Sequence, residues 1–559
     1  MKIMKTILVY LVVSFMTVSA RLYAFPGQGD SAYLNIKINN DTTTELQNEE
    51  QIVINPKDST NLVAVWRDFR LGYRQVGYGY SFDGGLTWHQ DLFVEPQYIW
   101  DSDPGLTVDT AGNFYAVILS YNSTDEPNGL FVYKSTDGGV SWQGPATVIN
   151  GVPGVFEDKE LIACDRSDGP YTDNLYVVWT RFYTTHILLS RSTDGGNSFE
   201  PPIRVSDNNG VQWPVPCIGP NSEVYVAWIN FTPGAIRFDL SSDGGQTFGT
   251  DNTIQDVSLV SEFINGNIQV YSFPALDADI TGGPYHGTIY VAYIDYAPGF
   301  TDTDIYFTRS QDGGMTWSQR IRINDDSLNN GCDQFHPWLT VAPDGNIIVV
   351  FLDRRLDSEN LLMDLYMTTS TDGGEIWSQN ERITTESSDP TAGSRWISRT
   401  SQQSPIRSIQ STILADRAGL LGEYIGVTAS SIDDIHPIWT DTRHGHQDVF
   451  VGVKDTAGPF IQEFVDNERN NVVLSIEPNP ATRKVVIKMT PHIETLLSEA
   501  TLKIFDLSGR IVRTFKSPNN LIVWERETDT GEPIGSGVYF CCLETDQFSI
   551  IKKFILLNR

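Results

Sequence analysis

Six near-copies of one eight-residue pattern decide the fold of this chain. The first copy reads Ser81-Phe82-Asp83-Gly84-Gly85-Leu86-Thr87-Trp88. The others begin at Ser135, Ser192, Ser241, Ser310 and Ser370. Asp-Gly-Gly supplies a side-chain acceptor for backbone N–H groups and two residues that tolerate positive φ. Each copy therefore predicts a tight turn between two strands, with its aspartate stabilising the turn.

The runs on either side of the turns predict four short strands per copy. Runs 104–109, 114–119 and 130–134 precede the second copy, and short runs such as 202–206 and 321–324 follow later copies. Four strands recurring with a period of several tens of residues are typical of a β-propeller. A seventh set without the pattern lies at 423–427, 436–439 and 448–451, and run 35–39 can supply its fourth strand. We expect an all-β propeller over residues 34–455, seven-bladed, with six blades as the alternative.

The repeated pattern resembles the Asp box (BNR repeat) of sialidases and related propellers. The resemblance covers the propeller region and implies a sialidase-like fold. It does not by itself imply activity, because Asp-box propellers include non-catalytic proteins.

The C-terminal part is expected to form a separate unit. Residues 456–471 have the composition of a linker, and residues 472–559 alternate apolar runs with Gly, Pro and Asp turns. This pattern favours a small immunoglobulin-like β-sandwich. The segments 477–480, 502–510, 536–540 and 552–556 resemble the C-terminal sorting domain of the type IX secretion system. That resemblance implies export, a secretion-machinery partner, and release or attachment at the cell surface.

The N-terminus and the overall charge restrict location and partners. Lys2 and Lys5 precede an apolar run, and small residues follow it, so residues 1–24 predict a secretory signal peptide. No later segment is long and apolar enough to predict a transmembrane helix. The 39 basic and 70 acidic residues give a net charge of −31, which argues against nucleic-acid binding. The five cysteines are expected to be buried, with a Cys164–Cys217 bridge possible.

Propeller topology places a ligand site on the face away from the Asp boxes. Chain direction reverses at each strand, so loops between second and third strands lie on that face. Just after three second strands stand Asp-x-Arg pairs: Asp68 with Arg70, Asp353 with Arg355, and Asp441 with Arg443. These pairs predict either ion pairs between blades that fix the loops or an arginine cradle for an anionic ligand. The long connection 387–422 adds Arg395 to the candidate substrate-binding residues.

The resemblance to sialidases also suggests catalytic residues. Sialidases use a tyrosine nucleophile assisted by a glutamate, with an aspartate as acid/base. Tyr424 and Glu423 could fill the first two roles, and Asp68 or Asp353 the third. The alternative for Tyr424 is a core aromatic residue.

Two functions remain open from sequence. The first is an exported sialidase-like glycoside hydrolase that acts on terminal anionic sugars of glycoconjugates. The second is a non-catalytic surface propeller that binds glycan or protein, because no Arg-Ile-Pro motif stands where sialidases carry their first arginine. No metal motif or cofactor is predicted, although a structural calcium ion could bind near Asp101 and Asp103.

Overall fold

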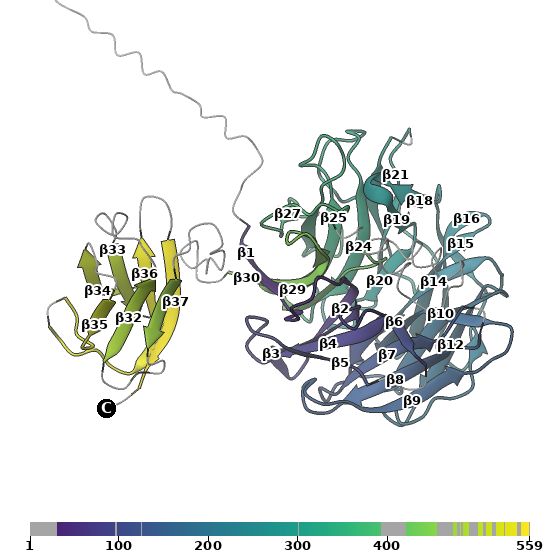
Figure 1. Cartoon of the computed structure of the whole chain (residues 1–559). Helices are drawn as coiled ribbons and strands as arrows, with labels where there is room; N and C mark the ends of the chain where they lie inside the picture. The colour runs from purple at the N-terminus through teal and green to yellow at the C-terminus, as the bar shows by residue number, and fades with distance from the viewer. Residues whose placement is uncertain are drawn as a thin grey trace, which may run out of the picture.

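The computed structural model describes residues 31–94, 98–124, 126–299, 301–392 and 421–455. In the C-terminal part it describes residues 473–477, 481, 484–490, 501–506, 510–516, 521–529, 531–544 and 549–557. The described residues form β-strands and one short 3-10 turn, η1 (Asn265–Asn267). The all-β prediction is therefore confirmed (Figure 1). The predicted signal peptide, the linker and Arg395 lie outside the described residues.

The first four sheets follow one another along the chain, each with four antiparallel strands in sequence order. The first contains β2 (Gln47–Asn55), β3 (Asp58–Asp68), β4 (Gln75–Ser81) and β5 (His89–Leu92). The second contains β6 (Trp100–Val108), β7 (Phe114–Tyr121), β8 (Gly129–Ser135) and β9 (Gln143–Asn150). The third contains β10 (Phe156–Cys164), β11 (Leu175–Phe182), β12 (His186–Ser192) and β13 (Ile203–Arg204). The fourth contains β14 (Val211–Ile218), β15 (Val224–Phe231), β16 (Gly234–Ser241) and β17 (Asn252–Asp256).

Three more four-stranded sheets and one hairpin complete the described propeller region. The hairpin pairs β18 (Ser261–Ile264) with β19 (Ile268–Tyr271). The fifth sheet contains β20 (Pro274–Ala278), β21 (Ile289–Tyr296), β22 (Thr303–Ser310) and β23 (Ile321–Arg322). The sixth contains β24 (Gln334–Val341), β25 (Ile347–Asp353), β26 (Asp364–Ser370) and β27 (Glu381–Arg382). The seventh contains β28 (Gly426–Ser431), β29 (Asp434–Asp441), β30 (Asp448–Lys454) and β1 (Tyr33–Lys37).

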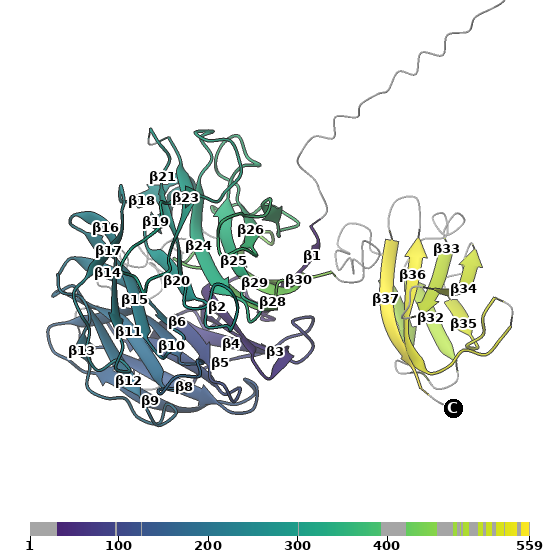
Figure 2. The same cartoon turned by 180° about the vertical axis from the view of Figure 1, so that it is seen from behind.

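The N-terminal strand completes the last sheet, as the sequence predicts. Strand β1 pairs antiparallel with β30, with Tyr33 opposite Lys454 and Lys37 opposite Phe450. The two strands lie side by side in both views (Figures 1 and 2). The first strand of each sheet contacts that of the next, and β28 contacts β2. The sheets therefore surround a common centre, with the first strands innermost, as in a propeller.

The Asp boxes join the third and fourth strands of six sheets. In the first box, the Ser81 hydroxyl donates to Asp83 (2.8 Å), and the backbone N–H and hydroxyl of Thr87 donate to the same carboxylate (2.9 and 2.7 Å). Gly84 and Gly85 have φ values of 70° and 84°, which glycine adopts without strain. Partial burial opposes ionisation, but these bonds hold the pKa of Asp83 below its usual value. The predicted turn-stabilising role is confirmed.

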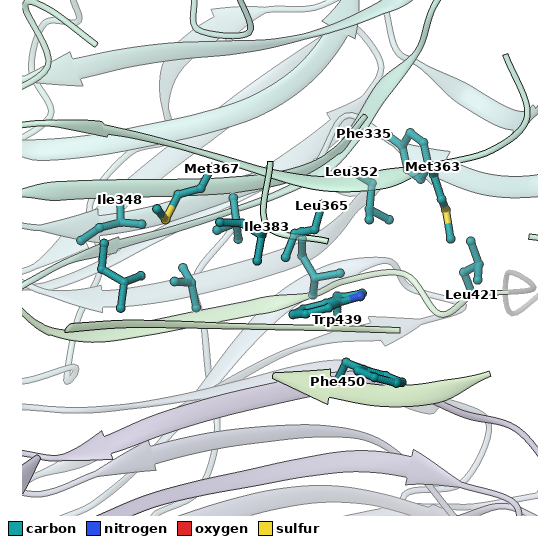
Figure 3. Close-up of a cluster of buried hydrophobic side chains, with 14 of the residues drawn as sticks. Phe335, Ile348, Leu352, Met363, Leu365, Met367, Ile383, Leu421, Trp439 and Phe450 are labelled. Carbon is teal, nitrogen blue, oxygen red and sulfur yellow. The ribbon is translucent and has the colours of Figure 1, made fainter. Parts of the chain in front are cut away.

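Apolar side chains fill the space between neighbouring sheets. Figure 3 shows the cluster between the sixth and seventh sheets, where Leu352 and Leu365 lie near Trp439 and Phe450. Strand β7, in the middle of the second sheet, is buried along its whole length, whereas the outer strand β5 of the first sheet is partly exposed. Trp66, Trp179, Trp228 and Trp439 are all fully buried at the ends of second strands. Cys164 and Cys217 are free and buried, so no bridge joins them.

The C-terminal unit consists of two sheets with its own apolar core. One sheet has the order β31 (Val473–Glu477), β32 (Val485–Thr490), β35 (Leu521–Trp524). The other has the order β34 (Ile511–Lys516), β33 (Thr501–Asp506), β36 (Gly537–Glu544), β37 (Ser549–Leu556). Ile487, Ile504, Trp524, Leu543 and Phe554 are buried in its core. Two sheets around one apolar core agree with the predicted small β-sandwich.

Candidate functional site

Five of the seven innermost strands carry the same irregularity. Strands β2, β6, β10, β14 and β24 each contain a bulge in their pairing with the second strand. At the same position in each bulge is a residue with φ between 48° and 60°: Glu49, Asp103, Lys159, Trp213 and His336. A left-handed conformation is costly for such residues, and bulges commonly re-aim side chains next to functional sites. The repeated bulge thus presents a different side chain from each of five blades.

Charged side chains from these strands meet around Lys159. We call the following residues the hub cluster: Glu49, Arg67, Asp103, Asp158, Lys159, Glu160, Glu423 and Tyr424. The Lys159 ammonium group lies 2.8 Å from an Asp103 oxygen and also forms an ion pair with Glu423. It lies 5.8 Å from the centre of the Trp213 ring, within the range of a cation–π contact.

The carboxyl groups of the hub cluster differ in their partners. Glu49 pairs with Arg67 at 3.0 Å, and Asp103 and Glu423 share Lys159. Glu160 is 2% exposed, and neither of its carboxyl oxygens has a hydrogen-bond partner among the described residues. An unpaired buried carboxylate is expensive, so this group either holds a proton or awaits a cationic partner.

These differences separate the pKa values of neighbouring carboxyls. Burial alone would raise the pKa of Asp103, but the charges of Lys159 and Arg67 hold it well below its usual value. Burial raises the pKa of Asp158 to about 7, and the charges of Asp103 and Glu423 add to the rise against the opposing effect of Lys159. Burial likewise raises the pKa of Glu160. One carboxylate is thus ionised beside another that is protonated near neutral pH.

A small cavity adjoins the hub cluster. It has a volume of about 20 Å³, and its polar lining comes from Asp103, Lys159, Glu160 and Tyr424. Its apolar wall consists of Leu161, Trp213, Pro214, Val215, Phe273 and Trp338. A space of this size holds one water-sized group.

The structure brings two of the predicted catalytic residues into this centre. Glu423 and Tyr424 lie just before β28, and Glu423 contacts Lys159. The Tyr424 hydroxyl donates to the Pro104 carbonyl (3.2 Å), and its ring lies 6.3 Å from that of Trp338. Burial raises the pKa of Tyr424, and the nearby charges of Glu49 and Asp103 add to the rise. This environment favours the neutral phenol, not an ionised nucleophile.

Each of the three Asp-x-Arg pairs forms an ion pair within its own blade, not between blades, because the two residues of a pair lie at the end of the same second strand. Arg70 binds Asp68 at 2.6 Å, Arg355 binds Asp353 at 2.8 Å, and Arg443 binds Asp441 at 2.7 Å. The Trp66 and Trp439 indole N–H groups donate to the same aspartates, Asp68 and Asp441 (2.8 and 3.0 Å).

The remaining donors of these arginines reach toward fourth strands. Arg70 bonds Gln90 of β5, and Arg443 bonds Asn35 of β1. Arg355 bonds Asn380, which precedes β27. Among the described residues, no two of the three arginines bind the same side chain, so these contacts do not gather them at one site. The substrate-binding role predicted for these arginines and for Asp441 stays a prediction. So do the catalytic roles of Asp68 and Asp353. The contacts seen here favour none of these roles.

The third sheet shows the same arrangement from different residues. The Trp179 indole and the Arg181 guanidinium both bond Glu157, which comes from the first strand β10 (2.6 and 2.5 Å). A tryptophan, a carboxylate and an arginine therefore recur as a unit that joins strands within a blade. This recurrence favours a structural role for the units.

Sequence reasoning missed Glu49, Asp158, Lys159 and Glu160 as site residues, and it named Asp103 only as a possible calcium ligand. A signal was present, because runs 47–51, 101–103 and 157–160 place polar and charged residues in strands that also carry apolar ones. Within the described residues, no three His, Cys, Asp or Glu side chains are grouped as a metal site. The calcium ion near Asp101 and Asp103 stays a prediction, and Asp103 is already paired with Lys159.

In the part of the chain that the structure describes, no helix is both long and apolar enough to cross a membrane.

No sequence match to a curated protein was found. Among the solved structures that resemble the chain are the following three, each with a TM-score below 0.5. A Hadza microbial sialidase, Hz136, is 15% identical, with 58% of this chain and 66% of that chain covered and a TM-score of 0.41.

The other two are similarly distant. A leech intramolecular trans-sialidase is 11% identical. The match covers 64% of this chain and 70% of that chain, with a TM-score of 0.43. An α-L-arabinanase from Penicillium chrysogenum is 14% identical, and the match covers 62% of this chain and 99% of that chain, with a TM-score of 0.41. In sequence, residues 475–557 match the family described as "Secretion system C-terminal sorting domain". The C-terminal unit of the chain is thus a sorting domain of a secretion system, as the sequence predicts.

Proposed function

We propose that the propeller is an exported glycoside hydrolase with its active site at the hub cluster. The observation that carries the proposal is the placement of Asp103, Asp158 and Glu423 around one lysine at the centre of the ring. Glycosidases need two carboxyl groups in different protonation states on either side of the scissile bond. Aromatic rings next to the cluster add an apolar surface for a sugar ring.

The two roles follow from the surroundings of each carboxyl group. Asp158 is half-buried and, with a pKa of about 7, can carry a proton to the glycosidic oxygen. Asp103 stays ionised beside Lys159 and can stabilise the oxocarbenium-like transition state or activate water. Lys159 is a positioning residue that pairs with Glu423 and keeps Asp103 ionised. Tyr424 acts as a neutral hydrogen-bond donor in this proposal.

The charge of the hub bears on the substrate. The cluster has five carboxyl groups (Glu49, Asp103, Asp158, Glu160, Glu423) and two cations (Arg67, Lys159). Because burial raises the pKa values of Glu49, Asp158 and Glu160, this number of carboxyl groups does not amount to an excess of negative charge near neutral pH and does not select against the anionic sugars predicted from sequence. Terminal sugars of glycoconjugates remain the proposed substrate class, with a sialoside as one arm of the test.

Hydrolysis of a panel of fluorogenic glycosides tests the proposal. The purified protein is expected to release the fluorophore from at least one glycoside. Asp158→Asn and Asp103→Asn should each lower kcat by about 100-fold or more. Asp256→Asn, on the exposed outer strand β17, is the matched control and should keep full activity. Equal activity of all three variants would contradict the assigned roles.

A second candidate function is a non-catalytic propeller that binds glycan or protein. The small size of the hub cavity, about 20 Å³, favours it, because a whole sugar ring does not fit in that space. Failure of the panel together with glycan-array binding that depends on hub residues would support this function. In either case the C-terminal sorting domain is proposed to direct the chain through the type IX secretion machinery to the cell surface or beyond.

A further inference from the structure

The proposed mechanism uses neither Glu49 nor Glu160, and of these two only Glu160 has no ion-pair partner among the described residues. Glu160 lies on β10 directly after Lys159, is 2% exposed, and lines the hub cavity. Its two oxygens have no hydrogen-bond partner among the described residues. The cations nearby are already committed, because Lys159 is paired with Asp103 and Glu423, and Arg67 is paired with Glu49. A buried acceptor facing an open space points to a missing donor.

The walls of the cavity select the kind of donor that fits. Trp213, Phe273, Trp338 and Tyr424 surround the space that Glu160 faces. Aromatic faces attract ammonium groups through their quadrupole, and a carboxylate adds a charge-assisted hydrogen bond. Lys159 already uses this chemistry, with its ammonium 5.8 Å from the Trp213 ring. The described residues contain no group of three His, Cys, Asp or Glu side chains placed to hold a metal ion, so a metal ion fits the cavity less well.

We infer that the hub cavity is a subsite for a primary ammonium group, and that Glu160 is its anchor. The volume of about 20 Å³ accepts one group of the size of –NH₃⁺ and excludes a trimethylammonium group. This inference rests on the proposed function. The substrates of the hydrolase would then be glycans whose terminal residue carries a free amino group. The ammonium group enters the cavity, while the sugar ring stays at the opening beside Asp103 and Asp158.

Calorimetry and thermal unfolding with methylammonium chloride test the subsite without any need for catalysis. The full chain at pH 7 should bind methylammonium and gain thermal stability, relative to sodium chloride at equal ionic strength. Tetramethylammonium, which is too large, should bind at least about tenfold more weakly. An equal effect of all three salts would overturn the inference.

A matched pair of variants assigns the binding to Glu160. Glu160→Gln keeps the shape and removes the charge, so it is expected to weaken methylammonium binding by at least about tenfold. Glu126→Gln changes an exposed glutamate and should bind as the unaltered protein does. Should Glu160→Gln fail to fold, glucosamine and N-acetylglucosamine replace the variant comparison, because acetylation removes the ammonium charge. Tight binding of glucosamine alone supports the subsite, and equal binding of the two sugars overturns it.

The outcomes separate this inference from the proposed function. Selective methylammonium binding without hydrolysis of any glycoside leaves the subsite standing and contradicts the hydrolase. Hydrolysis that is equally fast for free and N-acetylated amino sugars supports the hydrolase and overturns the subsite.

Discussion

The Asp-box turns, which we call the rim, and the hub cluster at the centre of the ring pair their polar side chains in different ways. In the first box, Asp83 receives all its hydrogen bonds from residues within four positions in sequence. In the hub, Lys159 meets Glu423, which is 264 residues away. The rim repeats one solution six times, whereas each hub strand presents a different side chain at the same bulge. Because the bonds of a box are local, a substitution there should lower the free energy of unfolding only slightly. Because the ion pairs of the hub join distant residues, a single substitution there should lower it more.

The largest effect is expected from removal of the central cation. Lys159→Met leaves Asp103 and Glu423 buried without their partner, which should lower the free energy of unfolding by about 3–5 kcal/mol at pH 7. Urea unfolding measures the loss. The control, Lys454→Met, breaks an exposed pair with Asp433 and should cost less than about 1 kcal/mol. Similar losses in the two variants would remove the proposed contrast between hub and surface.

The second effect is a dependence of stability on pH that originates in Asp158 of the hub cluster and in Glu50, which follows Glu49 on β2. Burial raises the pKa of Glu50 to about 8, against a bond from Thr440, and that of Asp158 to about 7. Between pH 5 and pH 8 the folded protein therefore binds more protons than the unfolded chain. The free energy of unfolding should fall as pH rises, by at most about 1.4 kcal/mol per pH unit for each group.

A variant identifies the group responsible. Glu50→Gln cannot titrate, so it should flatten the upper part of this decline in urea unfolding at pH 5, 6, 7 and 8. Glu359→Gln, which alters an exposed glutamate, should leave the slope unchanged. Stability that rises with pH over the whole window would show that these buried carboxyls are already ionised.

A smaller effect is expected at the rim. Asp83→Ala removes the acceptor of the bonds from Ser81 and Thr87, and should lower the free energy of unfolding by about 1–2 kcal/mol. Asp372→Ala should cost less, because Ile376 stands where other boxes have a hydroxyl residue. Thermal unfolding measures the loss of stability in each of the two variants. A larger loss in Asp372→Ala would mean that the side-chain hydroxyl adds nothing to the turn.

The smallest effect is a gain of stability. Ile376 is 72% exposed, and its backbone N–H donates to Asp372 at 2.9 Å. Ile376→Thr adds the missing hydroxyl bond and should raise the free energy of unfolding by about 0.5 kcal/mol. The reverse change in the fourth box, Thr247→Ile, removes a 2.6 Å bond to Asp243 and should cost a similar amount. Differential scanning calorimetry can compare the two, and a loss of stability in Ile376→Thr would contradict this account.

The same contrast explains what could be predicted from sequence. A box is a local pattern, so its turn, its aspartate bonds and the strands around it can be read from eight residues and their period. The pairing of β1 with β30 also follows, because the last set of strands lacks a fourth member. The sorting domain is recognisable from ordered motifs in one module.

The hub could not be predicted in the same way. The side chains of Asp103, Lys159 and Glu423 come from three different blades, and nothing in their local sequence fixes their distances. The bulges that re-aim these side chains have no glycine at the left-handed position, so the usual signal for positive φ is missing. Asp-x-Arg pairs are conspicuous in sequence for a simpler reason, since Arg70 and Asp68 need only two residues to reach each other.

The seam between β1 and β30 sets the order in which the propeller can be completed. Tyr33 lies opposite Lys454, so the seam closes a loop of more than 400 residues. The entropic cost of such a closure is ~5 kcal/mol and has to be met by contacts that already exist elsewhere in the ring. Because this pairing joins strands so far apart in sequence, we expect ring closure to come late in folding. A chain that is threaded through a membrane from its N-terminus cannot close its propeller until nearly all of it has emerged.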